Sequence, residues 1–259
     1  MDLHAKGLRV IITAGAGGIG KVTAETFLNN GATVFISDVD DAALAAMAKA
    51  HPKLGTMRAD VANVGQVDQM FSAALEFLGG LDVMINNAGI AGPTARVEDM
   101  TIEDWDRCIA VNLNGTFYCT RRAVPALKAA GGGSIINLSS SAGRLGFPLR
   151  TPYASAKFGL VGLTESLAIE LGPDNIRVNC IQPGMVEGER INRVIDAKAK
   201  ALGVSFDAYQ ERMLSRVSLR RMVSAQDIAN TILFLCSDLG RNISGQSVPV
   251  CGNVETLTS

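Results

Sequence analysis

The stretch Tyr153-Ala154-Ser155-Ala156-Lys157 holds the two side chains of this sequence best suited to proton chemistry. The apolar spacing over Tyr153–Leu171 predicts a helix, and residues four apart on a helix share one face. A neighbouring ammonium would therefore lower the pKa of the phenol from about 10. Such a phenol can exchange a proton with an alcohol or carbonyl oxygen. Because this pair also occurs on ordinary helices, the rest of the sequence decides its role.

Two further polar residues lie upstream of this pair. Ser140 follows a short apolar run, and Asn112 lies in the long helical pattern Asp104–Ala130. Ser139 and Ser141 are the alternatives to Ser140, and we interpret them as turn and cap residues. Asn112 could instead bridge backbone groups in a bent helix.

A glycine-rich loop follows the first β-branched run, Leu8–Thr13. It reads Ala14-Gly15-Ala16-Gly17-Gly18-Ile19-Gly20 and leads into a helical pattern. A strand, a glycine turn and a helix start form an anion site, because free backbone N–H groups and the helix dipole face the same point. An ordinary tight turn is the alternative, but the position after the first strand of a βαβ unit favours a dinucleotide pyrophosphate.

Asp38 follows at the end of the second predicted strand, where a carboxylate can accept hydrogen bonds from both ribose hydroxyls of a dinucleotide. The same carboxylate would repel a 2′-phosphate. No Lys or Arg stands between Thr13 and Gly20 or next to Asp38 in the sequence. These features predict NAD rather than NADP. Asp38 could instead cap the next helix, a role that Asp40 and Asp41 could also take.

Short strands alternating with helices must position these groups. The predicted strands are Leu8–Thr13, Ala32–Ser37, Thr56–Ala59, Leu81–Asn86, Ser134–Leu138, Arg177–Ile181 and Gln246–Val250. The predicted helices are Lys21–Asn30, Asp41–Ala50, Val64–Leu78, Asp104–Ala130, Tyr153–Leu171 and Ala225–Leu235. This alternation predicts a Rossmann-like α/β fold, a doubly wound parallel sheet of about seven strands with helices on both faces.

We expect residues 1–259 to form a single dinucleotide-binding and catalytic domain. The segment 187–223 interrupts the alternation, because it is charged, helical in pattern and without a strand. Ligands of open α/β folds bind at the carboxyl edge of the sheet. The segment is therefore predicted to be a substrate-binding lid over that edge.

Composition excludes several classes of protein. There are 24 Lys and Arg against 25 Asp and Glu, so there is no basic excess for nucleic acid. The longest charge-free stretch, Ala129–Gly143, is too short and too polar for a membrane span. The five scattered cysteines and an N-terminus without an apolar signal region predict a reduced, cytoplasmic protein. Only two histidines are present, which argues against His-based metal sites and Ser-His chemistry.

Taken in order, the motifs resemble those of the short-chain dehydrogenase/reductase family over Lys6 to about Val254. They are the glycine loop, Asp38, Asp60-Val61, Asn86-Asn87-Ala88-Gly89, Asn112, Ser140, Tyr153-x-x-x-Lys157 and Pro183-Gly184. The resemblance implies that Tyr153 exchanges a proton with the substrate oxygen and that Ser140 orients this oxygen. It also implies that Lys157 lowers the pKa of the tyrosine and holds the nicotinamide ribose, while Asn112 supports a proton-relaying water.

The resemblance further implies a set of NAD contacts and no metal. The implied contacts are Gly15, Gly18, Ile19, Gly20, Asp38, Asp60, Val61, Asn87, Ala88, Gly89, Tyr153, Lys157, Pro183, Gly184 and Val186. Three features depart from the family pattern. Ala14 replaces the first loop glycine, Glu187-Gly188 stands where a threonine is frequent, and Cys251-Gly252-Asn253 replaces an Asp-Gly-Gly.

We therefore predict an oxidoreductase that transfers a hydride between NAD(H) and a small polar secondary alcohol or ketone, such as a sugar, polyol or hydroxy acid. Arg144, Arg150 or Arg190 could pair with a substrate carboxylate, although arginines of this kind are usually solvated. The alternatives are a 3-oxoacyl-[acyl-carrier-protein] reductase that uses NADPH, and a non-catalytic nucleotide-binding scaffold. The resemblance implies a homotetramer built on the helices Asp104–Ala130 and Tyr153–Leu171.

Overall fold

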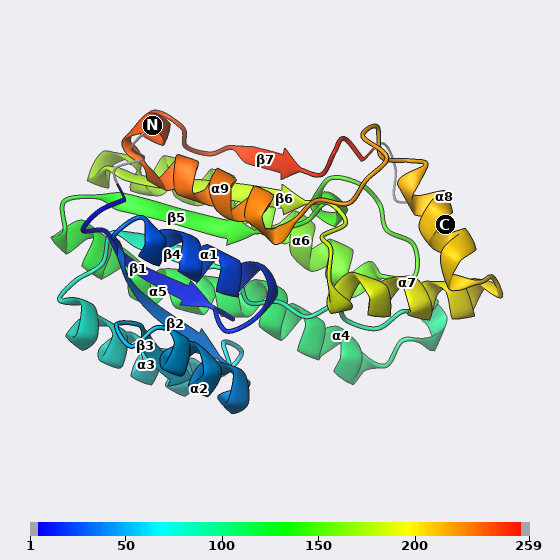
Figure 1. The fold of residues 1–259 in the computed structure, drawn as a ribbon, viewed down its shortest axis with the longest axis horizontal. Helices are drawn as coiled ribbons and strands as arrows, with labels where there is room; N and C mark the ends of the chain where they lie inside the picture. The colour runs from blue at the N-terminus through cyan, green and yellow to red at the C-terminus, as the bar shows by residue number, and fades with distance from the viewer. Residues whose placement is uncertain (1–4, 255–259) are drawn as a thin grey trace.

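The computed structural model describes residues 5–254, whose strands form one parallel sheet in the order β3-β2-β1-β4-β5-β6-β7 (Figure 1). The strands are β1 (Arg9–Thr13), β2 (Thr33–Asp38), β3 (Gly55–Arg58), β4 (Val83–Asn86), β5 (Gly133–Leu138), β6 (Ile176–Pro183) and β7 (Ser247–Val250). The order reverses between β1 and β4, which is the switch point where such sheets bind ligands. The prediction of a doubly wound parallel sheet of about seven strands is confirmed.

Helices cover both faces of the sheet (Figure 1). The α-helices of the described residues are α1 (Gly18–Asn29), α2 (Asp41–Ala50), α3 (Val64–Leu78), α4 (Ile102–Ile109), α5 (Gly115–Ala129), α6 (Thr151–Leu171), α7 (Glu189–Leu202), α8 (Phe206–Leu214) and α9 (Ala225–Cys236). Successive strand residues point to opposite faces, so Ile12 packs in the core beneath α1 and α9, while Ile11 packs in the core beneath α3 and α5. Strands buried on both faces explain the continuous apolar runs of the sequence.

The long helix predicted over 104–130 is divided. A π-helical turn, η2 (Ala110–Asn114), joins α4 to α5. Asn112 lies in this turn, and its amide is bonded to the backbone of Ile90. Helix periodicity alone does not report such a turn, because it depends on a contact with a distant loop.

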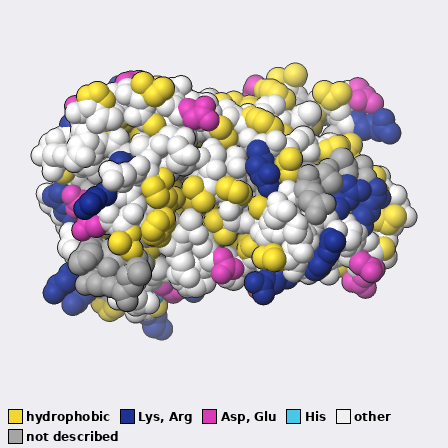
Figure 2. All heavy atoms as spheres, turned by 90° about the horizontal axis from the view of Figure 1, so that it is seen from above, with side chains coloured by type: hydrophobic (Ala, Val, Ile, Leu, Met, Phe, Trp, Pro, Cys, Tyr) yellow, Lys and Arg dark blue, Asp and Glu magenta, His cyan; other side chains and the backbone are white. Residues whose placement is uncertain are grey.

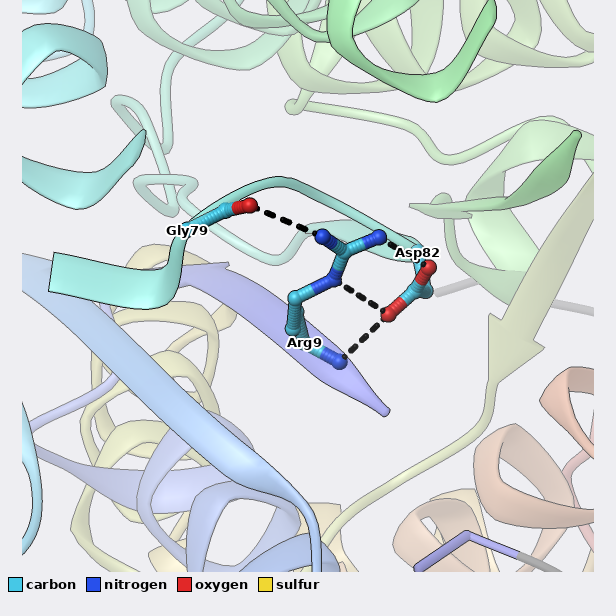
Figure 3. Close-up of polar contacts among 3 residues, drawn as sticks. All are labelled: Arg9, Gly79 and Asp82. Carbon is cyan, nitrogen blue, oxygen red and sulfur yellow. Dashed lines mark hydrogen bonds and ion pairs between the residues drawn. The ribbon is translucent and has the colours of Figure 1, made fainter. Parts of the chain in front are cut away.

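An ion pair fixes the opposite, N-terminal edge of the sheet (Figure 3). The Arg9 guanidinium donates from Nε and Nη2 to the two carboxylate oxygens of Asp82, each at 2.8 Å, and from Nη1 to the carbonyl of Gly79 at 2.9 Å. The backbone N–H of Arg9 also donates to Asp82. These bonds tie β1 to the turn that leads into β4, the two strands beside the switch point.

The segment 187–223 carries α7 and α8 and lies beyond the carboxyl edge, at the right of Figure 1. Ile195, Ala199 and Tyr209 form a small core between its two helices. An isolated β-bridge between Val186 and Val223 brings its two ends together. Among the described residues, no helix is long and apolar enough to cross a membrane.

Candidate active site

A cavity of about 660 Å³ lies between the carboxyl ends of the strands and α7. The predicted site residues that line it are Gly18, Ile19, Asp38, Asn87, Gly89, Ser140, Tyr153, Lys157, Pro183, Gly184 and Val186. Those outside its lining are Gly15, Gly20, Asp60, Val61, Ala88 and Asn112. One cavity thus joins the glycine loop to the tyrosine and serine.

The N-terminus of α1 has the features of an anion-binding site. Its cap, Gly17, makes no side-chain cap bond, and the first turn carries no acid, so the first N–H groups are left for a ligand. A Cβ at Gly17 or Gly18 would meet nothing within 4 Å, because both face the open cavity. At Gly20, by contrast, a Cβ would lie 2.1 Å from the carbonyl oxygen of Ala14. The loop therefore fits a pyrophosphate, and Gly20 permits the tight packing behind it.

Asn87 and Thr13 hold this loop against β4. The Asn87 amide donates to the carbonyls of Thr13 and Ala14, at 3.0 and 2.9 Å. The Thr13 hydroxyl accepts from the backbone N–H groups of Asn87 and Ala88. Ala14 adopts a left-handed φ of 50°, which an L-residue other than glycine seldom takes. Sequence reasoning missed Thr13, since an ordinary strand threonine gives no sign of this role.

Asp38 faces the cavity rather than capping α2. Its carboxylate accepts from the N–H of Ala16 in the glycine loop at 3.1 Å. The cap of α2 is Asp40, which accepts from Ala43 N–H. No Lys or Arg is next to Asp38 in the sequence, but in the sheet Arg58 of β3 is its register partner. The sequence does not show this neighbour, because β2 and β3 are separated along the chain. The Arg58 guanidinium forms an ion pair with Asp41 at 3.3 Å.

Tyr153 and Lys157 lie on α6 as the spacing predicts. The Lys157 Nζ is 5.6 Å from the centre of the Tyr153 ring and donates to the carbonyl of Leu138 at 2.7 Å. Burial raises the pKa of Tyr153, but the charge of Lys157 leads a set of opposing effects that leave it below its ordinary value. The others are the charge of Arg190, hydrogen bonding to Ser140 and the charge of Arg150. Burial lowers the pKa of Lys157.

The three neighbouring serines have different partners. The hydroxyl of Ser139 donates to the carbonyl of Lys157 at 2.7 Å, and that of Ser141 donates to the carbonyl of Pro183 at 3.1 Å. The Ser140 oxygen instead accepts from Ala142 N–H at 3.1 Å. Its proton is not used in that bond, so it can be donated to the Tyr153 oxygen or to a substrate oxygen beside it.

The Asn112 side chain is fully buried and bridges backbone groups. Its amide oxygen accepts from Ile90 N–H, and its nitrogen donates to the carbonyls of Ile90 and Cys108. A Cβ at Gly89 would lie 2.6 Å from this oxygen and 3.4 Å from the Lys157 Nζ. Asn112 thus holds the loop after β4 close to Lys157.

The remaining predicted contacts lie beside the cavity. Asp60 pairs with Arg107 at 3.0 Å and accepts from Ala62 N–H. Val61 is buried against Gly115, where an added Cβ would lie 2.6 Å from it. At Gly15, an added Cβ would lie 2.6 Å from Ile36. These residues shape the walls, whereas the implied contacts of Asp60 and Val61 with the adenine stay predictions.

The chain is similar to known oxidoreductases over nearly its whole length. A family model described as "Enoyl-(Acyl carrier protein) reductase" matches residues 13–253. A probable galactose dehydrogenase from Rhizobium meliloti is 37% identical, over 98% of this chain and 96% of that relative. A 3-oxoacyl-[acyl-carrier-protein] reductase from Thermotoga maritima is 36% identical, over 97% of this chain and 99% of that relative.

Solved structures agree with these sequence relatives. The crystal structure of NAD+-bound xylitol dehydrogenase superposes with a TM-score of 0.93 at 27% sequence identity. The match covers 96% of this chain and 100% of that one.

Proposed function

The chain belongs to the short-chain dehydrogenase/reductase family of oxidoreductases, and from this we propose that it transfers a hydride between NAD(H) and a secondary alcohol or ketone. The observation that carries the proposal is the single cavity that holds both the open start of α1 and the Ser140–Tyr153 pair. A non-catalytic scaffold would need the open start of α1 to bind a nucleotide, but it would not need the Ser140–Tyr153 pair.

The side chains divide the chemistry between them. Bound NAD would supply or accept the hydride. Tyr153 takes the alcohol proton during oxidation, and its lowered pKa makes the phenolate available. Ser140 donates its hydroxyl proton, which the bond from Ala142 N–H does not use, to the substrate oxygen. Lys157 stabilises the phenolate and would bind the nicotinamide ribose, while Asn112 would support a water that returns protons to Lys157.

Asp38 supports NAD over NADP. Its carboxylate is held at the cavity wall by Ala16 N–H, where the adenosine ribose would lie. A 2′-phosphate there would meet this negative charge. Arg58 could offset the repulsion, but Asp41 pairs with its guanidinium. The NAD+-bound xylitol dehydrogenase supports the same choice by analogy.

The substrate side supports a small polar molecule. Phe147, Met185 and Met213 form an apolar wall, and Arg150 and Arg190 supply charge. The Arg190 Nη1 donates to the carbonyl of Gly89 at 3.0 Å, so α7 contacts the loop after β4 across the cavity. We propose that residues 187–223 act as a lid within a single domain. The names of the galactose and xylitol dehydrogenases support a polar alcohol by analogy.

A 3-oxoacyl-[acyl-carrier-protein] reductase is the second candidate, favoured by the Thermotoga maritima relative. A cofactor and substrate panel separates the two. We expect NADH formation from at least one secondary alcohol, polyol or hydroxy acid at mildly alkaline pH. Activity confined to NADPH and a 3-oxoacyl thioester would instead support the second candidate.

We also propose that the chain forms a homotetramer through α4, α5 and α6. These helices keep large apolar side chains in solvent, which a second copy could cover. They are Ile102, Trp105, Phe117, Phe158 and Ile169.

A further inference from the structure

Two cations are buried beside the substrate end of the cavity. Arg150 is 2% exposed and Lys198 is 0% exposed. Side chains of these types are almost never fully buried unless they are paired. Within residues 5–254, no carboxylate forms a salt bridge with either one. The described residues therefore provide no counterion for this charge.

Arg150 has unused hydrogen-bonding capacity. Its Nη2 donates to the carbonyl of Ala91, whereas its Nε is buried and has no partner among the described residues. A guanidinium carries five N–H donors in one plane. The bond to the Ala91 carbonyl uses one of these five donors. This bond alone therefore does not explain why an arginine is buried here.

Arg150 and Lys198 pack around the same aromatic ring. The guanidinium carbon of Arg150 lies 5.3 Å from the centre of the Phe147 ring, and the Lys198 Nζ lies 4.2 Å from it. Lys198 also donates to the carbonyl of Pro148 at 2.8 Å. Burial, followed by the charge of Arg150, lowers the pKa of Lys198 to about 8. A bound anion would relieve this repulsion.

The guanidinium also lies beside the ring of Tyr153. Its central carbon lies 5.1 Å from the centre of the Tyr153 ring, and both residues line the cavity. The acids that line the cavity lie elsewhere: Asp38 ends β2, while Glu187 and Glu189 are exposed at the start of the lid. Arg144, another candidate from the sequence, donates instead to the carbonyl of Val254.

We propose that Arg150 binds a carboxylate of the substrate, with Lys198 adding positive charge behind Phe147, so that the substrate is a hydroxy or keto acid. The inference rests on the proposed function, because Tyr153 must act on the same molecule. A planar guanidinium suits a planar carboxylate, and a neutral sugar would leave the buried charge uncompensated.

Binding of keto acids to the NAD+-saturated protein tests the proposal, since no hydride transfer can follow. The probes are pyruvate, 3-oxobutanoate and 4-oxopentanoate, each compared with its neutral amide by calorimetry. We expect at least one acid to bind about 10- to 100-fold more tightly than its amide, the range of a charge-assisted hydrogen bond. Acids that bind no better than their amides would overturn the proposal.

Three variants locate the effect. Arg150→Met should remove the preference for the acid, and Arg150→Lys, which keeps the charge without the planar donors, should reduce it. Arg96→Met is the matched control, because it removes an exposed arginine that does not line the cavity and should leave the preference intact. If Arg150→Met does not fold, the preference for the acid over its amide is measured in Arg150→Lys and Lys198→Met instead, and we expect it to be reduced. An unchanged preference in both would contradict the proposal.

NAD+ affinity, measured in the same samples, separates this inference from the proposed function. A wild-type protein that does not bind NAD+ would contradict the proposed function itself. Tight NAD+ binding without any preference for acids would contradict only the carboxylate site.

Discussion

The neighbours of Tyr153 outweigh the effect of burial on its pKa, as the proposed role of a base requires. A partly buried phenol resists ionisation, and Lys157 provides the strongest opposing charge. The lysine is itself held by the carbonyl of Leu138. The acidity of the tyrosine therefore depends on one buried contact between α6 and the end of β5.

Replacement of Lys157 by methionine should raise the pKa of Tyr153, because it removes the largest effect that lowers this pKa. Phenolate would then form only at higher pH, so the rise of alcohol oxidation with pH should shift toward alkaline values at saturating NAD. The pH profile of kcat measures the shift, and ultraviolet titration of tyrosine, with Tyr153→Phe as reference, assigns it. An unchanged profile would contradict the electrostatic role of Lys157.

Asp38 should set the cofactor preference. We expect the KM for NADP to exceed that for NAD by about tenfold or more in the wild type, a difference of about 1.4 kcal/mol. Asp38→Ser should narrow this ratio, because the repulsion disappears while Arg58 remains on the adjacent strand.

Asp40→Ser is the control for this change. It keeps a side chain able to cap α2 and should leave the ratio of the KM for NADP to the KM for NAD unchanged. Equal KM values for NAD and NADP in the wild type would refute the assignment of Asp38.

At the scale of the elements, β1 and β4 form the switch point, and the Arg9–Asp82 pair secures their other end. The burial of Asp82 raises its pKa, but the hydrogen bonds and charge of Arg9 leave the pKa below its usual value. A carboxyl group with a lowered pKa stabilises the fold above its unfolded pKa. This contribution is lost as the pH falls through the folded pKa.

Asp82→Asn should lower the free energy of unfolding at neutral pH by about 1 to 3 kcal/mol, as expected for charge-assisted hydrogen bonds. The difference in the free energy of unfolding between this variant and the wild type should shrink as the pH falls, because protonation of Asp82 removes the same charge from the wild type. Urea denaturation at several pH values measures both effects. Asp174→Asn, which breaks the more exposed pair with Lys128, should cost about 0 to 1 kcal/mol. Equal losses in the two variants would contradict a special role for Arg9 and Asp82.

At the scale of the whole molecule, apolar surface remains after the sheet and its helices have packed. Besides the exposed side chains of α4, α5 and α6, Figure 2 shows hydrophobic side chains gathered over the region of α9 and β7. Among the exposed large apolar side chains, Phe234 lies on α9 and Leu239 in the turn that follows it, at 37% and 46% exposure. Two separate apolar surfaces are what a tetramer with two kinds of interface requires.

Light scattering after gel filtration should give four times the mass of one chain. Phe158→Asp should shift the protein toward smaller species, because it places a charge in the interface proposed for α6. Val204→Asp, an apolar-to-acid change at an exposed position between α7 and α8, should not. A wild-type monomer would contradict the proposed assembly.

The sequence was sufficient to predict the sheet, because strands that are buried on both faces appear in the sequence as continuous apolar runs. It also predicted that Tyr153 and Lys157 share a face, because that spacing is local to one helix. It could not predict the π-helical turn at Asn112, the position of Arg58 beside Asp38 or the burial of Arg150. Each depends on segments far apart in the chain, and arginines are usually exposed.

Replacement of Tyr153 by phenylalanine tests the central claim most directly, with turnover of the best alcohol from the panel and NADH binding measured on the same preparation. The variant lacks only the phenol oxygen that we propose as the proton acceptor. Turnover should fall about 100- to 10,000-fold while the affinity for NADH stays close to that of the wild type. Turnover near the wild-type rate would contradict proton transfer by Tyr153.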